Sequence, residues 1–335
     1  MEDLTCLEIC AGAGGQSLGL EQAGFSHSVA VELDSDACET LRLNRPDWHV
    51  VEKDVHSFSG KEFKEVDLLA GGVPCPPFSI AGKQLGADDE RDLFPQALRL
   101  VEEAEPNAVM LENVRGLAGA RFSGYRQQIL DRLEELGYVP DWQLFNSSEF
   151  GVPQLRPRFI LVAVKKELAN HFAWPSAVKS PSTVGSELHE LMAASGWLGA
   201  KEWSKKRANG VGPTLVGGSR KHGGPDLGPT RAREAWLKLG VDGRGIANAA
   251  PTADDPIDFT PKLTLEMAAR VQGFPPEWKF YGKKTAAYRQ IGNAFPPPVA
   301  KAIGESIATA VRAGAAADTA QFEAERRLAL HSVAS

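Results

Sequence analysis

Residues 66–80 read VDLLAGGVPCPPFSI, in which a short apolar run gives way to two glycines, three prolines and a cysteine. The apolar run predicts a β-strand over 66–69, and the glycines and prolines end it because they continue neither a strand nor a helix. Cys75 is therefore expected on a turn at the carboxyl end of a strand. Ligands bind outside these strand ends in doubly wound α/β sheets. Cys75 is thus a candidate nucleophile, with a small buried apolar side chain as the alternative.

A polar stretch with several glycines follows at 79–92, before a helical pattern begins at Leu93. Such a loop can fold over a bound substrate and exclude water, with Gly82 and Gly86 as candidate hinges. The alternative is a surface loop without a function.

Apolar patterning over the rest of the chain predicts alternating strands and helices. The strands are expected over 4–9, 28–31, 49–52, 66–69, 108–111 and 159–164, and the helices over 16–23, 35–44, 125–136, 230–239 and 299–311. This alternation predicts an α/β fold with a doubly wound sheet.

A glycine-rich turn, CAGAGG at 10–15, lies between the first strand and the first helix. Glycines in this position let a nucleotide-like cofactor approach the backbone. The dinucleotide fingerprint would need a third spaced glycine at position 17, where the chain has Ser17. The turn therefore favours an adenosyl ligand without a pyrophosphate.

Acidic residues follow the next strand ends. Glu32 comes about 20 residues after Gly12, where a carboxylate can accept hydrogen bonds from both hydroxyls of a ribose. Asp54 is placed either to bond an adenine amino group or to cap the next turn.

Glu112 directly follows the strand expected at 108–111, so its carboxylate and the Cys75 thiol are expected to project into one crevice. Arg156 and Arg158 precede the strand at 159–164. In an extended chain a spacing of two residues points both guanidinium groups to one side, towards a phosphate or a base oxygen.

Composition limits the class of protein. The 335 residues include four cysteines, without a CxxC pair or a histidine at metal spacing, which argues against a zinc site, any other metal site and a disulfide framework. The absence of an apolar leader or of a long apolar run predicts a soluble, cytoplasmic protein. The net charge is −6, yet residues 201–233 hold eight Lys or Arg against two acids. This segment is either a polyanion-binding face or a solvated loop.

The ordered set of motifs resembles the DNA (cytosine-5)-methyltransferase family. The matching stretches are EICAGAGG at 8–15, the acidic turns at Glu32 and Asp54, GVPC at 72–75, ENV at 112–114, QLRPR at 154–158, ARVQGFP at 269–275 and QIGNA at 290–294. They cover about 4–165 and 263–310. The segment 166–262 lies where the family keeps its variable target-recognition domain.

This resemblance implies a Rossmann-like methyltransferase domain with a smaller, irregular target-recognition domain. The implied divisions are 1–170 for the first part of the catalytic domain, 171–262 for target recognition, 263–312 for a return segment and 313–335 for a C-terminal tail. It also implies S-adenosyl-L-methionine as cofactor and double-stranded DNA as substrate. A restriction endonuclease acting on the same site is the further expected partner, and the chain is expected to be a monomer.

The resemblance assigns the chemistry to four residues. Cys75 would add to ring carbon 6 of a flipped-out cytosine, so that carbon 5 can take the methyl group. Glu112 would deliver a proton or hydrogen bond to ring nitrogen 3. Arg158 would hold the base oxygen, with Arg156 close to the phosphate or the thiol.

The remaining assignments concern the cofactor and the DNA. The expected cofactor residues are Cys10, Ala11, Gly12, Gly14, Gly15, Glu32, Leu33, Asp54, Val55, Gly72, Pro74, Asn293 and Ala294. The expected DNA-binding residues are Ser79, Lys83, Gln84, Arg220, Lys221, Arg231, Arg233 and Arg244.

Other classes fit less well. A tRNA cytosine-5 methyltransferase would use the same catalytic set, although the long variable segment favours duplex DNA. A non-catalytic DNA-binding regulator would have little reason to keep both Cys75 and Glu112. A zinc deaminase needs a second cysteine where Phe78 stands, and an NAD-dependent oxidoreductase fails at Ser17.

Overall fold

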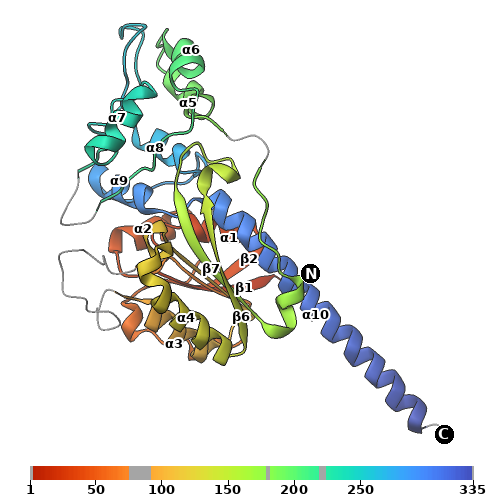
Figure 1. The fold of residues 1–335 in the computed structure, drawn as a ribbon. Coiled ribbons are helices and arrows are strands. Elements are labelled where there is room, and N and C mark those ends of the chain that lie inside the picture. Colours follow the sequence, from red (N-terminus) through yellow and green to blue (C-terminus); the bar gives the residue numbers. More distant parts are fainter. Residues whose placement is uncertain (1–2, 75–91, 179–181, 219–223, 334–335) are drawn as a thin grey trace.

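The computed structural model describes residues 3–74, 92–178, 182–218 and 224–333, with side chains to residue 317. Its strands form one seven-stranded sheet in the order β3-β2-β1-β4-β5-β7-β6, with helices on both faces (Figure 1). The first five strands pair in parallel, whereas β7 runs antiparallel to β5 and β6. The strands are β1 (Leu4–Ile9), β2 (Phe25–Glu32), β3 (Val50–Glu52), β4 (Leu68–Gly71), β5 (Ala108–Val114), β6 (Tyr138–Asn146) and β7 (Pro157–Lys165). The predicted doubly wound α/β fold is confirmed.

The register of the parallel strands explains where a site can form. Ile9 lies opposite Val31 on one side and Gly71 on the other, and Gly71 lies opposite Leu111. The carboxyl ends of β2, β1, β4 and β5 are therefore level. The turns that follow these strands meet at one edge of the sheet.

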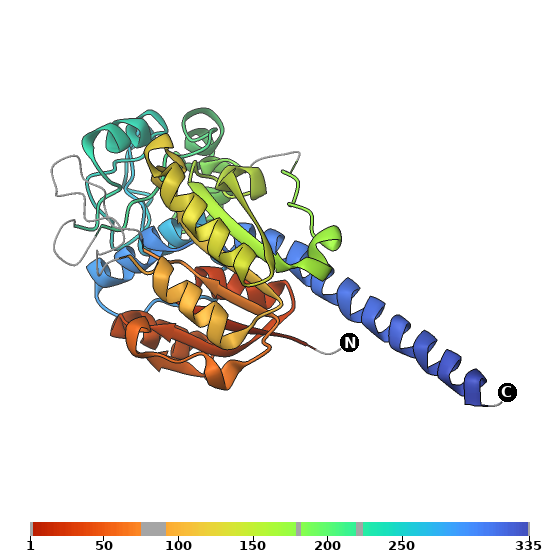
Figure 2. The ribbon, with the colours of Figure 1, turned by 60° about the horizontal axis from the view of Figure 1, so that its bottom comes forward.

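Alternating side chains build a core on each face of the sheet, as the two-residue period of a strand requires. On one face Leu69 and Leu111 pack with α3 (Phe94–Ala104) and α4 (Ser123–Glu135). On the other face the packing partners are α1 (Gly15–Gln22) and α10 (Pro297–Val333). Figures 1 and 2 show these two helical layers with the sheet between them.

The segment 166–262 is more helical than the sequence predicted. It contains α5 (Val184–Ala193), α6 (Ala200–Glu202), a π-helical turn at Trp203–Arg207 and α7 (Thr230–Lys238). Only the last of these was expected. The prediction missed α5, although its buried Val184, Leu188 and Met192 recur at helical spacing.

Three helices complete the chain around the sheet. α2 (Ser35–Asn44) has the bounds that the sequence predicted. α8 (Leu265–Val271) and α9 (Lys284–Asn293) follow the segment 166–262, which is called the helical segment below. α10 continues to Val333 and projects from the body of the molecule (Figure 2), where a shorter helix and a separate tail were expected. None of the helices in the described ranges has the length and apolarity needed to cross a membrane.

A close helix crossing gives a test of this packing. A Cβ on Gly19 of α1 would lie 2.4 Å from the Pro297 carbonyl oxygen, at the start of α10, whereas a Cβ on Gly124 of α4 would meet nothing within 4 Å. We expect Gly19→Ala to lower the free energy of unfolding by about 1–3 kcal/mol, because the helices must separate. Gly124→Ala should raise it by about 0.4–1 kcal/mol through lost chain entropy. Urea denaturation of both variants tests this, and equal effects would contradict the described crossing.

Candidate functional site

A cavity of about 320 Å³ opens at the level strand ends of the sheet. The expected cofactor residues that line it are Cys10, Ala11, Gly12, Gly15, Glu32, Gly72, Pro74, Asn293 and Ala294. The sequence therefore identified most of the wall. The lining also includes Glu112, which places the expected catalytic carboxylate beside the expected cofactor residues.

The glycines of the turn after β1 have two different functions: one leaves its backbone open to a ligand, and two allow close packing. Gly12 has a positive φ of 55°, and a Cβ there would meet nothing within 4 Å, so its backbone is open to a ligand. Gly14 and Gly15 are instead closed by packing. A Cβ on Gly14 would lie 2.6 Å from the Trp278 ring, and one on Gly15 would lie 2.2 Å from the Phe295 carbonyl oxygen.

Glu32 organises the turn after β2. Its Oε2 accepts from Gly12 N at 2.8 Å, and its Oε1 accepts from Leu33 N at 2.8 Å and Asp34 N at 2.7 Å. Burial raises the pKa of the Glu32 carboxyl, although these backbone bonds oppose the shift. A carboxylate accepts about four hydrogen bonds, so about one acceptor position remains for a ligand hydroxyl.

Asp54 caps the next turn, which is one of its two expected roles, and its bond to an adenine amino group stays a prediction. Its Oδ1 accepts from His56 N at 2.9 Å and lies 2.8 Å from His56 Nδ1, which caps the 3-10 turn Val55–Ser57. Leu33, Asp54 and Val55 lie outside the lining of the cavity. Leu33 is nevertheless 65% exposed, so its side chain is open to solvent.

Cys10 is a second thiol at the cavity, and it is not a candidate nucleophile. Burial raises the pKa of its thiol, and the nearby carboxylates of Glu32 and Asp54 raise it further. A protonated thiol is a poor nucleophile. Cys10 therefore serves as part of the wall.

Glu112 and Arg158 form an ion pair on neighbouring strands. Arg158 Nε contacts Glu112 Oε1, and both side chains are nearly buried. A Cβ on Gly72 would lie 3.6 Å from Glu112 Oε2, and Asn113 Nδ2 donates to Val73 O at 2.8 Å. The carboxylate thus stands beside the turn that leads to Cys75, which itself lies outside the described residues.

Arg156 is buried between two backbone carbonyls. Its side chain is 1% exposed, and it donates to Leu215 O and Gly292 O, each at 2.9 Å. The expected place of Arg156 close to the phosphate or the thiol stays a prediction, because Cys75 lies outside the described residues. Burial lowers the pKa of the Arg156 guanidinium, and the adjacent Arg158 adds to this effect.

The expected DNA-binding residues are only partly described. Ser79, Lys83, Gln84, Arg220 and Lys221 lie outside the described residues.

The three expected DNA-binding residues that the structure describes lie on α7 and the loop after it. Arg231 is exposed. Arg233 Nη2 donates to Thr230 Oγ1 at 3.2 Å, and Arg244 Nε lies 2.8 Å from Asp242 Oδ1. A phosphate would compete with these internal partners.

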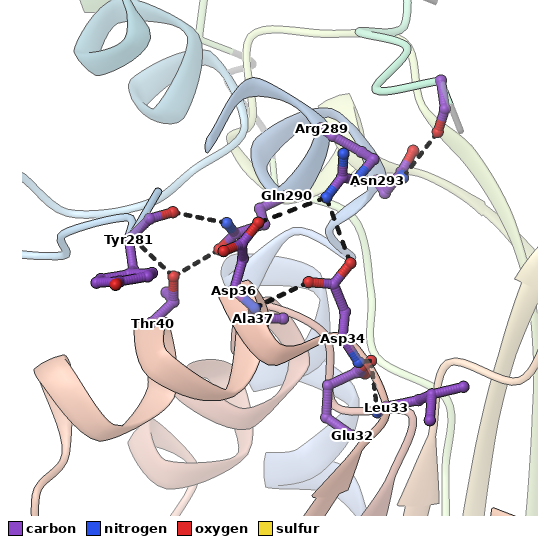
Figure 3. A network of polar contacts seen from close by, with 11 residues as sticks. Glu32, Leu33, Asp34, Asp36, Ala37, Thr40, Tyr281, Arg289, Gln290 and Asn293 are labelled. Atoms are coloured by element: carbon purple, nitrogen blue, oxygen red, sulfur yellow. Dashed lines mark hydrogen bonds and ion pairs between the residues drawn. The ribbon is translucent and has the colours of Figure 1, made fainter. Parts of the chain in front are cut away.

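Sequence reasoning missed a group of residues opposite Glu32. Arg289 and Gln290 of α9 and Asp34 at the start of α2 all line the cavity. Figure 3 shows Arg289 paired with Asp34, and Gln290 bonded to Thr40 and Tyr281. Gln290 belongs to the QIGNA stretch and Arg289 directly precedes it. Asp34 lies two residues after Glu32. The motifs could therefore have pointed to them, but not to their contacts.

Comparison with known proteins agrees with this geometry. The family model of the C-5 cytosine-specific DNA methylase matches residues 4–211 and 239–309. The Type II methyltransferase M.NaeI of Lentzea aerocolonigenes is 58% identical over 315 residues, which cover 93% of this chain and 76% of that protein. The Type II methyltransferase M.NgoMIV of Neisseria gonorrhoeae is 52% identical over 314 residues, which cover 92% and 98%.

Solved structures resemble the chain over most of its length. A crystal structure from E. coli, described as a prophage-encoded DNA modification methyltransferase, superposes with a TM-score of 0.64 and 26% identity, covering 92% of this chain and 99% of that one. Spodoptera frugiperda DNMT2 superposes with a TM-score of 0.63 and 16% identity over 91% and 99%, a likeness of fold alone. By the family match and these relatives, the chain belongs to the C-5 cytosine-specific DNA methylase family.

Proposed function

We propose that this protein transfers the methyl group of S-adenosyl-L-methionine to carbon 5 of a cytosine flipped out of a specific short DNA sequence. The observation that carries the proposal is the position of the Glu112–Arg158 pair. It stands at the same strand ends as a cavity suited to an adenosyl ligand, beside the turn that leads to Cys75.

The cavity fits the cofactor in its chemistry. Gly12 leaves its backbone open, and Glu32 keeps about one acceptor position for a ribose hydroxyl. Glu32, Asp34 and Glu112 make the wall acidic, which suits the positive charge of a sulfonium group. The bound cofactor supplies an electrophilic methyl group.

The residues of the chain prepare the cytosine for this methyl group. The Cys75 thiolate adds to ring carbon 6, which makes carbon 5 nucleophilic. Glu112 supplies a proton or hydrogen bond to ring nitrogen 3, where negative charge develops. Arg158, held beside Glu112 in the structure, binds the base oxygen. After methylation, a base takes the hydrogen at carbon 5 as a proton, and the electrons of that bond restore the ring double bond and expel the Cys75 thiolate.

Duplex DNA is favoured over tRNA as the substrate. The family is described as a cytosine-specific DNA methylase, and the highly similar relatives are named Type II methyltransferases. We infer that 171–262 reads the DNA, that 1–170 and 263–312 form the catalytic domain, and that 313–335 is a tail. The names of the relatives also suggest a cognate restriction endonuclease and a protective role at its site. We expect the protein to act as a monomer.

The first prediction concerns the nucleophile. Cys75→Ser should abolish methyl transfer, and DNA containing 5-fluorocytosine should trap the wild type as an adduct stable to denaturant, because fluorine cannot leave as a proton does. Cys6→Ala, which changes a buried thiol within β1, should still form the adduct. Bisulfite sequencing of plasmid from a methylation-free host measures activity and target together. Full methylation by Cys75→Ser would refute the assignment.

The second prediction concerns the cofactor. Glu32→Ala removes the acceptor of Gly12 N, Leu33 N and Asp34 N together with the proposed ribose contact. Binding of S-adenosylmethionine should weaken by about 1.5–3 kcal/mol, the range for hydrogen bonds to a charged group. Calorimetry measures this, with Glu102→Ala, a change to an exposed carboxylate of α3, as the control. Unchanged affinity in Glu32→Ala would exclude the role.

The third prediction concerns DNA reading. Alanine substitution of Arg220, Lys221, Arg231, Arg233 or Arg244 should impair DNA binding and leave cofactor binding intact. Loss of a phosphate contact should lower affinity for all sequences and reduce the salt dependence by about 1 in slope. Loss of a base contact should relax preference at one position by about 1–3 kcal/mol, and we expect this of at least one of the five. If all five bind like the wild type, the recognition surface lies elsewhere in 166–262 and the basic cluster is only solvated surface.

A further inference from the structure

Arg289 connects two walls of the cofactor cavity (Figure 3). It lies on α9, and its Nη2 is 3.3 Å from Asp34 Oδ2 and 3.8 Å from Asp36 Oδ2, which belong to the turn after β2 and the first turn of α2. Arg289 and Asp34 both line the cavity. Their side chains are 17% and 25% exposed, so the pair is partly shielded from solvent.

Asp34 connects Arg289 with Glu32, the carboxylate proposed to bind the cofactor ribose. Its Oδ1 accepts from Asp36 N at 3.0 Å and Ala37 N at 3.3 Å, which caps α2. Its own N–H donates to Glu32 Oε1 at 2.7 Å, and Glu32 Oε2 accepts from Gly12 N at 2.8 Å. An unbroken series of polar contacts therefore runs from Arg289 to the glycine turn.

Arg289 is not needed to hold α9 in place. The adjacent Gln290 accepts from Thr40 Oγ1 at 2.5 Å and donates to Tyr281 O at 2.9 Å, and these bonds attach α9 to α2 and to the loop before α9 (Figure 3). Ala287, Tyr288 and Ile291 bury the apolar side of α9. The Arg289 side chain is thus free to serve the cavity.

The charge of Arg289 also has a local purpose. It is the one basic side chain that lines the described part of the cavity, against the carboxylates of Glu32, Asp34 and Glu112. Like charges held close together repel one another. A cation between α9 and the acidic turn lets Glu32 and Asp34 stay close, as their hydrogen bonds require.

We propose that Arg289 is a positioning residue for the cofactor: through Asp34 it fixes the turn that presents the Glu32 carboxylate to the cofactor ribose. The inference rests on the proposed function and adds to it a residue outside the catalytic set. A group that is held in place before binding costs less ordering when the ligand arrives. Loss of Arg289 should therefore weaken cofactor binding more than it slows the saturated enzyme.

The test is calorimetric binding of S-adenosylhomocysteine to the full chain. Arg289→Ala should bind it about fivefold more weakly, the factor expected for a partly exposed ion pair, and Arg289→Lys should recover part of the loss. The KM for S-adenosylmethionine should rise by a similar factor, with kcat near that of the wild type. Arg132→Ala, which removes exposed ion pairs from α4, should change neither.

A double-mutant cycle decides whether Arg289 acts through Asp34. Asp34→Asn keeps an oxygen to cap α2 but removes the charge. If Arg289 acts through Asp34, the double variant binds no more weakly than the weaker single variant.

Three outcomes would overturn the proposal. Additive losses in the cycle would mean that Arg289 acts independently of Asp34. Wild-type affinity in Arg289→Ala would exclude positioning, even if thermal stability falls. A wild type that fails to bind S-adenosylhomocysteine would refute the proposed function itself. This outcome differs from a failure of the Arg289 proposal alone, in which the wild type still binds.

Discussion

One buried guanidinium, that of Arg156, joins the three segments on which the site depends. Its chain position directly precedes β7, and it donates to carbonyls of Leu215 in the helical segment and Gly292 in α9. Burial of an ionised group costs several kcal/mol unless its donors are satisfied. The two carbonyls accept from Nη1 and Nη2 only when all three segments are assembled, and Nε has no hydrogen-bond partner among the described residues. Because Arg158 follows two residues later on β7, the same constraint places Arg158 against Glu112.

The backbone of α9 touches the helical segment without side chains between them. A Cβ on Gly292 would lie 2.4 Å from Gly217 N, and one on Gly217 would lie 2.4 Å from the Arg289 carbonyl oxygen. Asn293 Nδ2 also donates to Gly218 O at 3.1 Å. Arg289 and Asn293 of α9 also line the cavity. One helix is therefore shared by the cofactor site and by the segment that leads to Arg220 and Lys221.

The sequence predicted the parts of the fold that have a strong local signal. Buried parallel strands read as apolar runs, so the strands that carry Glu32 and Glu112 were found, although β5 continues to Val114 beyond its predicted end at 111. β6 was missed because most of its residues are not buried and its pattern is mixed. The central strands are buried on both faces and therefore give a strong apolar signal, whereas much of the edge strand β6 is buried on neither face.

Side-chain partners were harder to predict than positions. Spacing placed Arg156 and Arg158 on one side of an extended chain, but Arg156 turned inward because carbonyls from Leu215 and Gly292, 59 and 136 residues away, lie there. By contrast, the cap that Asp54 forms is local, because its side chain accepts from the backbone N–H of His56, only two residues later. Contacts with distant segments depend on tertiary packing, which no motif encodes.

The net charge of −6 does not argue against DNA binding, because DNA contacts only a local part of the surface. Exposed ion pairs such as Arg244–Asp242 contribute little to stability. Counterion release favours each new contact with a DNA phosphate. An acidic chain can therefore exchange internal partners for a polyanion at small cost.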